Sequence, residues 1–208
     1  TSMIAIDVET TGLNPWTDRL LGLSVTENVE GTLRSTYFPW GGSGAVFPFP
    51  YDILKDPTIR KVGHNLRFDI KFLRVNGVEV AGPWEDTKLI AQLIDENQQL
   101  GLKPLSKKYF SSVALKYHAA LMEHLKSLKL TMGDLSDPRV DQMLVARYCE
   151  EDTENTYRLY DVLSKKLSKA QKEYYYTEMI KLEPVLLEME LEGNNVDTAR
   201  VDAAEKAL

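Results

Sequence analysis

The chain of 208 residues lacks several features that mark particular classes of protein. Cys149 is its only cysteine, so no disulfide can form within the chain, as is usual in a reducing intracellular compartment. No apolar stretch approaches the length of a membrane span, and the N-terminus has no signal-peptide pattern. We therefore expect a soluble, intracellular protein without a membrane partner.

A surplus of positive charge is also missing. With 25 basic and 31 acidic residues the net charge is −6, which argues against a broad basic surface for nucleic acid. Two local groups of basic residues remain, Arg60, Lys61, Arg67, Lys71 and Arg74 in the first and Lys103, Lys107 and Lys108 in the second. Taken alone, both groups are typical of solvated helix faces.

Strand-like patterns fill the first third of the chain. Met3–Val8 begins with a short apolar run, which is typical of a strand buried on both faces. Leu20–Glu27 and Thr32–Trp40 follow it after polar turns, and the three segments together predict an antiparallel meander. A loop rich in glycine and proline is expected at Gly41–Pro50.

Helical patterns dominate the remainder. Thr58–Asn65 predicts a short strand that leads into a helix ended by Gly77. A long helix is expected to begin near Pro138, with Asp137 as its N-cap. Further helices are predicted at Glu85–Asp95, Leu102–Phe110, Val113–Leu128 and from Lys169 onward, where Pro184 kinks or starts a segment. Strands followed by helices indicate an α/β or α+β layer structure.

Asp7 and Glu9, at the end of the Met3–Val8 strand, are the first candidate site. Side chains two residues apart on a strand point the same way, so these carboxylates would crowd one face. Like charges this close raise a pKa unless a cation compensates, and a divalent ion with oxygen ligands is the natural compensator. Solvated or turn-capping carboxylates are the alternative interpretation.

Two further pairs of residues have the spacing of one helical turn. Asn65 and Asp69 lie near a helix start, where an Asn cap and a first-turn Asp would also be ordinary. Tyr148 and Asp152 lie on the late helix, where an exposed Asp and a partly buried Tyr would be equally ordinary. Each pair alone is uninformative, so a functional interpretation depends on their combination with the first motif.

In this order, Asp-x-Glu, Asn-x-x-x-Asp and Tyr-x-x-x-Asp resemble the motifs of the DEDD exonucleases. Tyr148 indicates the tyrosine-type branch, because none of the three histidines stands at the corresponding distance before Asp152. Glu85–Asp95 and Gly101–Phe110 are similar to segments of family A DNA polymerases and of ribonuclease D. Glu178–Ala204 is similar to the entry into the polymerase domain of family A enzymes, a segment that ribonuclease D is not expected to have.

The resemblance implies the 3′-5′ exonuclease (proofreading) domain of a family A DNA polymerase at residues 1–168. Residues 169–208 would be the helical start of a truncated polymerase domain, and the early position of the first motif is similar to that of phage-type enzymes. The implied fold is α/β and ribonuclease H-like, with a mixed sheet of about five strands flanked by helices. The implied partners are the 3′ end of single-stranded DNA and the remainder of the polymerase chain, in the cytoplasm of a bacterium or a phage-infected cell.

The family's roles, carried onto this sequence, imply two divalent metal ions, Mg²⁺ or Mn²⁺, that cleave the terminal phosphodiester and release nucleoside monophosphates. Asp7, Glu9 and Asp152 would hold the ion that activates water. Asp7 would bridge to a second ion with Asp69 in its shell, and Tyr148 would orient the water. The substrate strand would be held by Thr10, Leu13 (as a wedge), Asn65 and Phe68. Core packing is an alternative role for Leu13 and Phe68.

Two other classes of protein remain open. A catalytically silent nucleic-acid-binding module would keep the fold, but such modules typically lose carboxylates, and all four are present here. A stand-alone, ribonuclease D-like enzyme that trims RNA would share the motifs but not the Glu178–Ala204 segment. A preference for DNA or RNA 3′ ends would separate the RNA-trimming enzyme from the proofreading domain.

Overall fold

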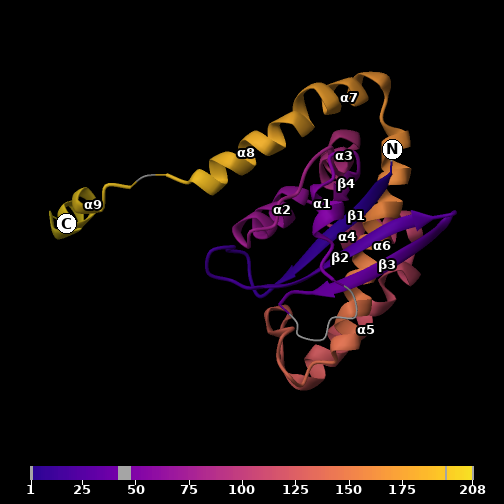
Figure 1. The fold of residues 1–208 in the computed structure, drawn as a ribbon, viewed down its shortest axis with the longest axis horizontal. Helices are drawn as coiled ribbons and strands as arrows, with labels where there is room; N and C mark the ends of the chain where they lie inside the picture. The colour runs from indigo at the N-terminus through magenta and orange to yellow at the C-terminus, as the bar shows by residue number, and fades with distance from the viewer. Residues whose placement is uncertain (1, 42–47, 195, 208) are drawn as a thin grey trace.

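The computed structural model describes residues 2–41, 48–194 and 196–207 (Figure 1). Its centre is a five-stranded mixed sheet with the strand order β3-β2-β1-β4-β5. β1 (Met3–Thr10), β2 (Leu20–Val29) and β3 (Thr32–Pro39) form the predicted antiparallel meander. β4 (Arg60–Gly63) and β5 (Trp84–Asp86) run parallel to β1.

The chain leaves β1 toward β2 on one side and returns to β4 on the other side. β1 therefore stands at a switch point of the sheet, where ligands commonly bind beyond the C-terminal strand ends. The helices are α1 (Tyr51–Lys55), α2 (Leu66–Val75), α3 (Thr87–Ile94), α4 (Leu102–Phe110), α5 (Lys116–Leu128), α6 (Gln142–Lys166), α7 (Lys169–Tyr174), α8 (Ile180–Glu192) and α9 (Thr198–Ala207). Tyr175–Met179, between α7 and α8, is π-helical, and short 3₁₀ turns occur at Ser112–Leu115 and Met132–Asp134.

The two faces of β1 serve different purposes. Ile4, Ile6 and Val8 point into a core that they share with α2, where Ile70 and Phe72 are fully buried. Because side chains alternate along a strand, the odd-numbered residues of β1 point the other way, toward α6. α6 lies across β1, β2 and β3 (Figure 1). The even-numbered face of β1 thus packs in the core with α2, and the odd-numbered face, which carries Asp7 and Glu9, is turned toward α6.

Two predicted boundaries are wrong. The long helix α6 begins at Gln142, and its N-cap is Asp141, whose carboxylate accepts hydrogen bonds from the N–H groups of Met143 and Leu144. Pro138 instead lies in a turn, because the Val140 N–H donates to the Asp137 carbonyl oxygen at 2.9 Å. The second boundary concerns Glu85–Asp95, where the first two residues end strand β5 and only Thr87–Ile94 is helical.

Other expected elements match the structure more closely. The helix at Leu102–Phe110 is present with the predicted bounds, and Gly77, with φ at 78°, follows α2 as expected. Of the predicted loop at Gly41–Pro50, residues 42–47 lie outside the described residues. Pro184 lies inside α8 and does not start it.

The segment after residue 168 packs against the sheet domain. Tyr175 is fully buried among residues of α3, α4 and α6, and Leu187 of α8 is fully buried in the core beside α2. By contrast, α9 lies well away from the sheet (Figure 1). Within the part of the chain that the structure describes, no helix is long and apolar enough to cross a membrane.

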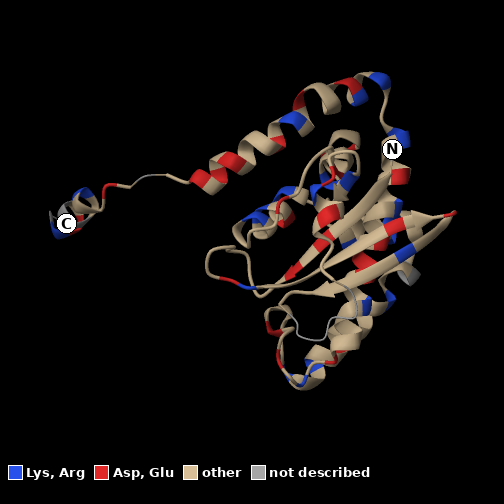
Figure 2. Cartoon of the chain, in the orientation of Figure 1, with Lys and Arg blue, Asp and Glu red and all other residues tan. Residues whose placement is uncertain are grey.

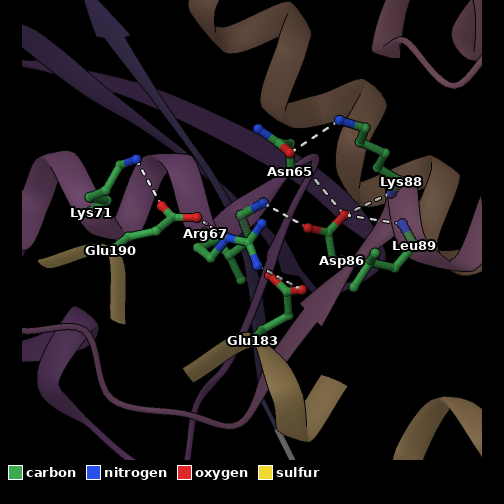
Figure 3. Close-up of polar contacts among 9 residues, drawn as sticks. Asn65, Arg67, Lys71, Asp86, Lys88, Leu89, Glu183 and Glu190 are labelled. Carbon is green, nitrogen blue, oxygen red and sulfur yellow. Dashed lines mark hydrogen bonds and ion pairs between the residues drawn. The ribbon is translucent and has the colours of Figure 1, made fainter. Parts of the chain in front are cut away.

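Ion pairs join α8 to α2. Basic residues lie on α2 and acidic residues run along α8 (Figure 2). Arg67 pairs with Glu183 at 3.3 Å and with Glu190 at 3.2 Å, and Lys71 pairs with Glu190 at 2.8 Å (Figure 3). Arg74 pairs with Glu188 at 3.2 Å. These α2–α8 ion pairs correct the interpretation of the first basic group as a purely solvated helix face.

Candidate active site

β1 extends beyond its parallel neighbour β4 at the end where the acidic residues lie. Ala5 is the last β1 residue paired with β4, at Val62, whereas pairing with β2 continues as far as Thr10. The register with β2 shifts between Glu9 and Thr10. The C-terminal half of β1 therefore has one open edge, and Asp7 and Glu9 lie in this half.

α6 brings the third motif to the same place. Ser24 and Thr26 of β2 are each 2.8 Å from the Thr153 hydroxyl, which fixes the helix against the sheet beside Asp152. Thr153 donates in turn to backbone carbonyl oxygens one turn earlier in α6. Because Tyr148 and Asp152 are one helical turn apart, both reach the odd-numbered face of β1.

Asp7, Glu9 and Asp152 form a carboxylate cluster. One oxygen from each residue lies within 4.8 Å of the others, and Glu9 and Asp152 are buried. Burial and the neighbouring Asp152 raise the pKa of Asp7 to about 7. Burial, followed by Asp7 and Asp152, also raises the pKa of Glu9. Three hard oxygen donors crowded this closely suit a divalent cation.

Asp69 approaches β1 from the opposite side. Its Oδ1 accepts a hydrogen bond of 2.9 Å from the Val8 N–H, a backbone group that lies beyond the end of the pairing with β4. Burial and then Asp7 raise the pKa of Asp69. Among the described residues, however, Asp69 does not belong to the group whose oxygens could share one ion. The structure therefore brings three of the four predicted carboxylates into one cluster and places the fourth at the open edge of β1, beside the Val8 N–H.

Tyr148 lies beside the cluster with its ring buried. Burial, followed by Glu9 and Asp152, raises the pKa of its hydroxyl, so the phenol is neutral at physiological pH. A neutral phenol can donate one hydrogen bond and accept others, which suits it to orienting a water molecule.

Lys103 of α4 is a site residue that the sequence analysis missed. Its Nζ pairs with the Asp152 carboxylate and lies 4.5 Å from the centre of the Tyr148 ring. The interpretation of the second basic group as a solvated helix face is therefore wrong for this residue. A signal was present in the sequence, since a lysine in the first turn of a helix opposes the helix dipole.

A cavity of about 400 Å³ opens over the cluster. Of the predicted substrate-binding residues, Thr10, Leu13 and Phe68 line it. Leu13 is 82% exposed, so core packing does not explain this leucine. Phe68 also packs against the core around Phe72.

Asn65 is the predicted substrate residue that does not line this cavity. It stands before α2 with φ at 71°, and its side-chain oxygen accepts a hydrogen bond from Lys88 at 3.2 Å. It does not cap α2 with its side chain. Asp86 takes that place, because its carboxylate accepts from the N–H groups of Asn65 and Leu66 and also caps α3 (Figure 3).

A family model for the 3′-5′ exonuclease of family A DNA polymerases matches residues 1–168. The chain belongs to this family. It is 29% identical to DNA polymerase I of Borreliella burgdorferi over 93% of this chain and 21% of that protein. It is also 29% identical to DNA polymerase DpoZ of Acinetobacter phage SH-Ab 15497, over 93% of this chain and 31% of that protein. The chain thus spans about a fifth to a third of the length of these curated relatives.

Among solved structures, Brucella melitensis NrnC with bound Mg²⁺ is 25% identical, with a TM-score of 0.67. The similarity covers 94% of this chain and 89% of the NrnC chain, so it extends beyond residue 168. The predicted ribonuclease H-like exonuclease fold is confirmed. A helical segment after residue 168, however, does not by itself separate a polymerase fragment from a nuclease of NrnC size.

Proposed function

We propose that this exonuclease domain proofreads for a family A DNA polymerase. It would hydrolyse the 3′-terminal phosphodiester of single-stranded DNA and release nucleoside monophosphates. The observation that carries this proposal is the carboxylate cluster at the end of β1, with Tyr148 beside it. Residues 1–168 would be the nuclease domain and residues 169–208 the start of the polymerase domain, as the much longer polymerase relatives suggest.

Asp7, Glu9 and Asp152 are the residues that would hold divalent metal, Mg²⁺ or Mn²⁺. The donor chemistry fits, because each offers a carboxylate oxygen and two of the three are buried. When bound, a pair of such ions supplies an activated water and neutralises charge on the phosphate and the leaving oxygen. Asp69, whose carboxylate accepts from the Val8 N–H at the open edge of β1, would belong to the shell of a second ion that it shares with Asp7.

The remaining residues would position water and substrate. Tyr148 would orient the attacking water through its hydroxyl, beside the Glu9 carboxylate, because its raised pKa keeps the phenol protonated and leaves no phenolate to act as a base. Thr10 and Phe68 would contact the terminal nucleotide, and the exposed Leu13 would wedge against its base. Asn65, which does not line the cavity, would contact a more distant part of the DNA strand through its side-chain amide. A single-stranded end suits an acidic protein, because it needs few basic contacts.

A second candidate is a stand-alone nuclease that acts on RNA ends or short oligonucleotides. It is favoured by the NrnC similarity, which spans most of both chains. A silent binding module is disfavoured, because all four carboxylates are present at the end of β1.

A cleavage assay with DNA and RNA of the same sequence tests the proposal. The protein is given 5′-labelled single-stranded DNA, RNA of the same sequence and a dinucleotide, each with Mg²⁺, Mn²⁺ or EDTA. We expect a ladder of DNA shortened from the 3′ end, with nucleoside monophosphates released and no cleavage in EDTA. Preference for RNA or for the dinucleotide would instead support the second candidate. Folded protein that is inactive with either metal would contradict both enzymatic readings.

A further inference from the structure

Lys103 occupies an unusual place for a lysine. It is the second residue of α4, whose N-cap, Gly101, supplies no side-chain hydrogen bond. Positive charge at a helix N-terminus is unfavourable, because the helix dipole already places partial positive charge there. Such a position is suited to an anion, and Gly101, Leu102 and Lys103 all line the cavity over the cluster.

The surroundings of Lys103 hold its ammonium group ready for an anion. Its side chain is 24% exposed, and the Nζ lies between the Asp152 carboxylate and the Tyr148 ring. Of the described residues that line this cavity, it is the only lysine or arginine. A lysine side chain is flexible enough to exchange one oxygen partner for another nearby.

In the proposed function, two positively charged groups compete for the Asp152 carboxylate. This carboxylate pairs with Lys103 in this structure, and it would also be a ligand of the divalent metal. A metal ion and an ammonium group repel each other, so both are not expected to share the same carboxylate oxygen. The phosphate of a bound DNA end is the anion that would enter the cavity beside them.

We infer that Lys103 is a further catalytic residue that binds the scissile phosphate. Its ammonium leaves Asp152 when the 3′ end enters and donates hydrogen bonds to the non-bridging phosphate oxygens. This charge-assisted contact strengthens as negative charge grows on the phosphate during cleavage. The inference rests on the proposed function, since it requires a phosphodiester over the cluster.

The kinetic test compares Lys103→Met, Lys103→Arg and the control Lys107→Met. Lys107 lies on the same helix but is exposed and does not line the cavity. Lys103→Met should lower kcat by about 10²-fold and change KM by much less. Lys103→Arg should recover part of kcat, and Lys107→Met should match the wild type. Lys103→Met with unchanged kcat would overturn the inference.

A metal titration shows whether the Lys103→Met site is intact. Mn²⁺ should still raise the Tm of this variant, because its carboxylates remain. If the Mn²⁺ response disappears together with activity, Lys103 has only a structural role and the inference fails.

A comparison of binding affinities in EDTA distinguishes a failure of this inference from a failure of the proposed function. The ligands are an oligonucleotide with a normal 3′-terminal phosphodiester and one with a neutral methylphosphonate at that linkage. The wild type and Lys107→Met should prefer the charged ligand by several-fold, and Lys103→Met should lose this preference. Equal preference in Lys103→Met and the wild type would overturn the inference. An inactive wild type would count against the proposed function alone, because the binding comparison needs no turnover.

Discussion

The carboxylate cluster and the α2–α8 ion pairs use charge in opposite ways. In the cluster, Asp7, Glu9 and Asp152 bring like charges within 4.8 Å of one another, and Lys103 pairs with only one of them, Asp152. Between α2 and α8, opposite charges meet at distances from 2.8 to 3.3 Å on a partly exposed surface. The repulsion within the cluster opposes folding of the metal-free protein, whereas the attraction between α2 and α8 favours folding.

If the proposed function is correct, the cluster residues serve catalysis and the α2–α8 residues serve the stability of the fold. Removing a member of the cluster relieves repulsion, so the fold should tolerate it while activity does not. Removing a member of an exposed ion pair loses a small attraction, so stability should fall slightly while activity persists. Four experiments test the contrast, ordered from the largest expected effect to the smallest.

Asp7→Asn should nearly abolish exonuclease activity without lowering the stability of the metal-free protein. The loss should be about 10³-fold, the size expected for losing roughly 4 kcal/mol of charge stabilisation. The Tm in EDTA at pH 8 should stay the same or rise, and the stabilisation by Mn²⁺ should shrink. Asp161→Asn, an exposed change on α6, is the control. A variant that unfolds, or that keeps its activity and Mn²⁺ response, contradicts the cluster as a metal site.

Tyr148→Phe should reduce the cleavage rate by about 10²-fold, because the ring remains packed but the water-orienting hydroxyl is lost. The carboxylates are untouched, so Mn²⁺ should raise the Tm as much as in the wild type. Tyr157→Phe on the same helix, outside the cavity, should cleave normally. Wild-type rates in Tyr148→Phe would exclude a role for the hydroxyl.

The Tm of the metal-free protein should fall as the pH rises. The pKa of Asp7 is about 7 in the folded protein against an ordinary value of 3.8, and the pKa values of Glu9 and Asp69 are also raised. Between pH 3.8 and about 7 the folded state therefore keeps a proton on Asp7 that the unfolded state releases. The stability that this proton contributes at low pH is lost as the pH rises through 7. Melting curves in EDTA at constant ionic strength measure this trend.

Two controls accompany the pH series. Asp7→Asn should flatten it, and Mn²⁺ should stabilise the wild type most at the alkaline end, where the carboxylates are charged. A Tm in EDTA that climbs steadily from pH 4 to pH 8 would show that the cluster does not oppose folding.

Glu190→Ala should cost less than about 1 kcal/mol of unfolding free energy, because its two ion pairs are partly exposed. The difference from the wild type should shrink in 1 M NaCl, which screens the pairs. Glu192→Ala is the control, since Glu192 is exposed and has no ion pair among the described residues. Exonuclease rates should stay within about twofold of the wild type. A large loss of activity in Glu190→Ala would mean that α8 controls the site.

The parts of the site that the sequence predicted are those whose geometry follows from local spacing. Asp7 and Glu9 share a face because strand side chains alternate, and Tyr148 and Asp152 share one because they are a helical turn apart. The order of the motifs then identified the family, and with it the five-stranded fold.

The parts that escaped prediction depend on contacts between distant segments. Lys103 becomes a site residue only because the start of α4 faces the end of β1. Asp69 binds the Val8 N–H because β4 is too short to pair with it, and the length of β4 has no local signal. The choice of Asp141 over Asp137 as the cap of α6 likewise followed from a turn that ends in the buried Val140.

The anchoring of Thr153 to β2 has a consequence for how this domain tolerates insertions and deletions. Each added residue turns an α-helix by about 100° and lengthens it by about 1.5 Å. Thr153 fixes the rotation of α6 at one point, through Ser24 and Thr26. One residue inserted between Tyr148 and Thr153 would therefore swing Tyr148 away from the cavity. An insertion in the loop before Asp141 would leave the fixed turn in place, so length variation in related domains should gather in that loop.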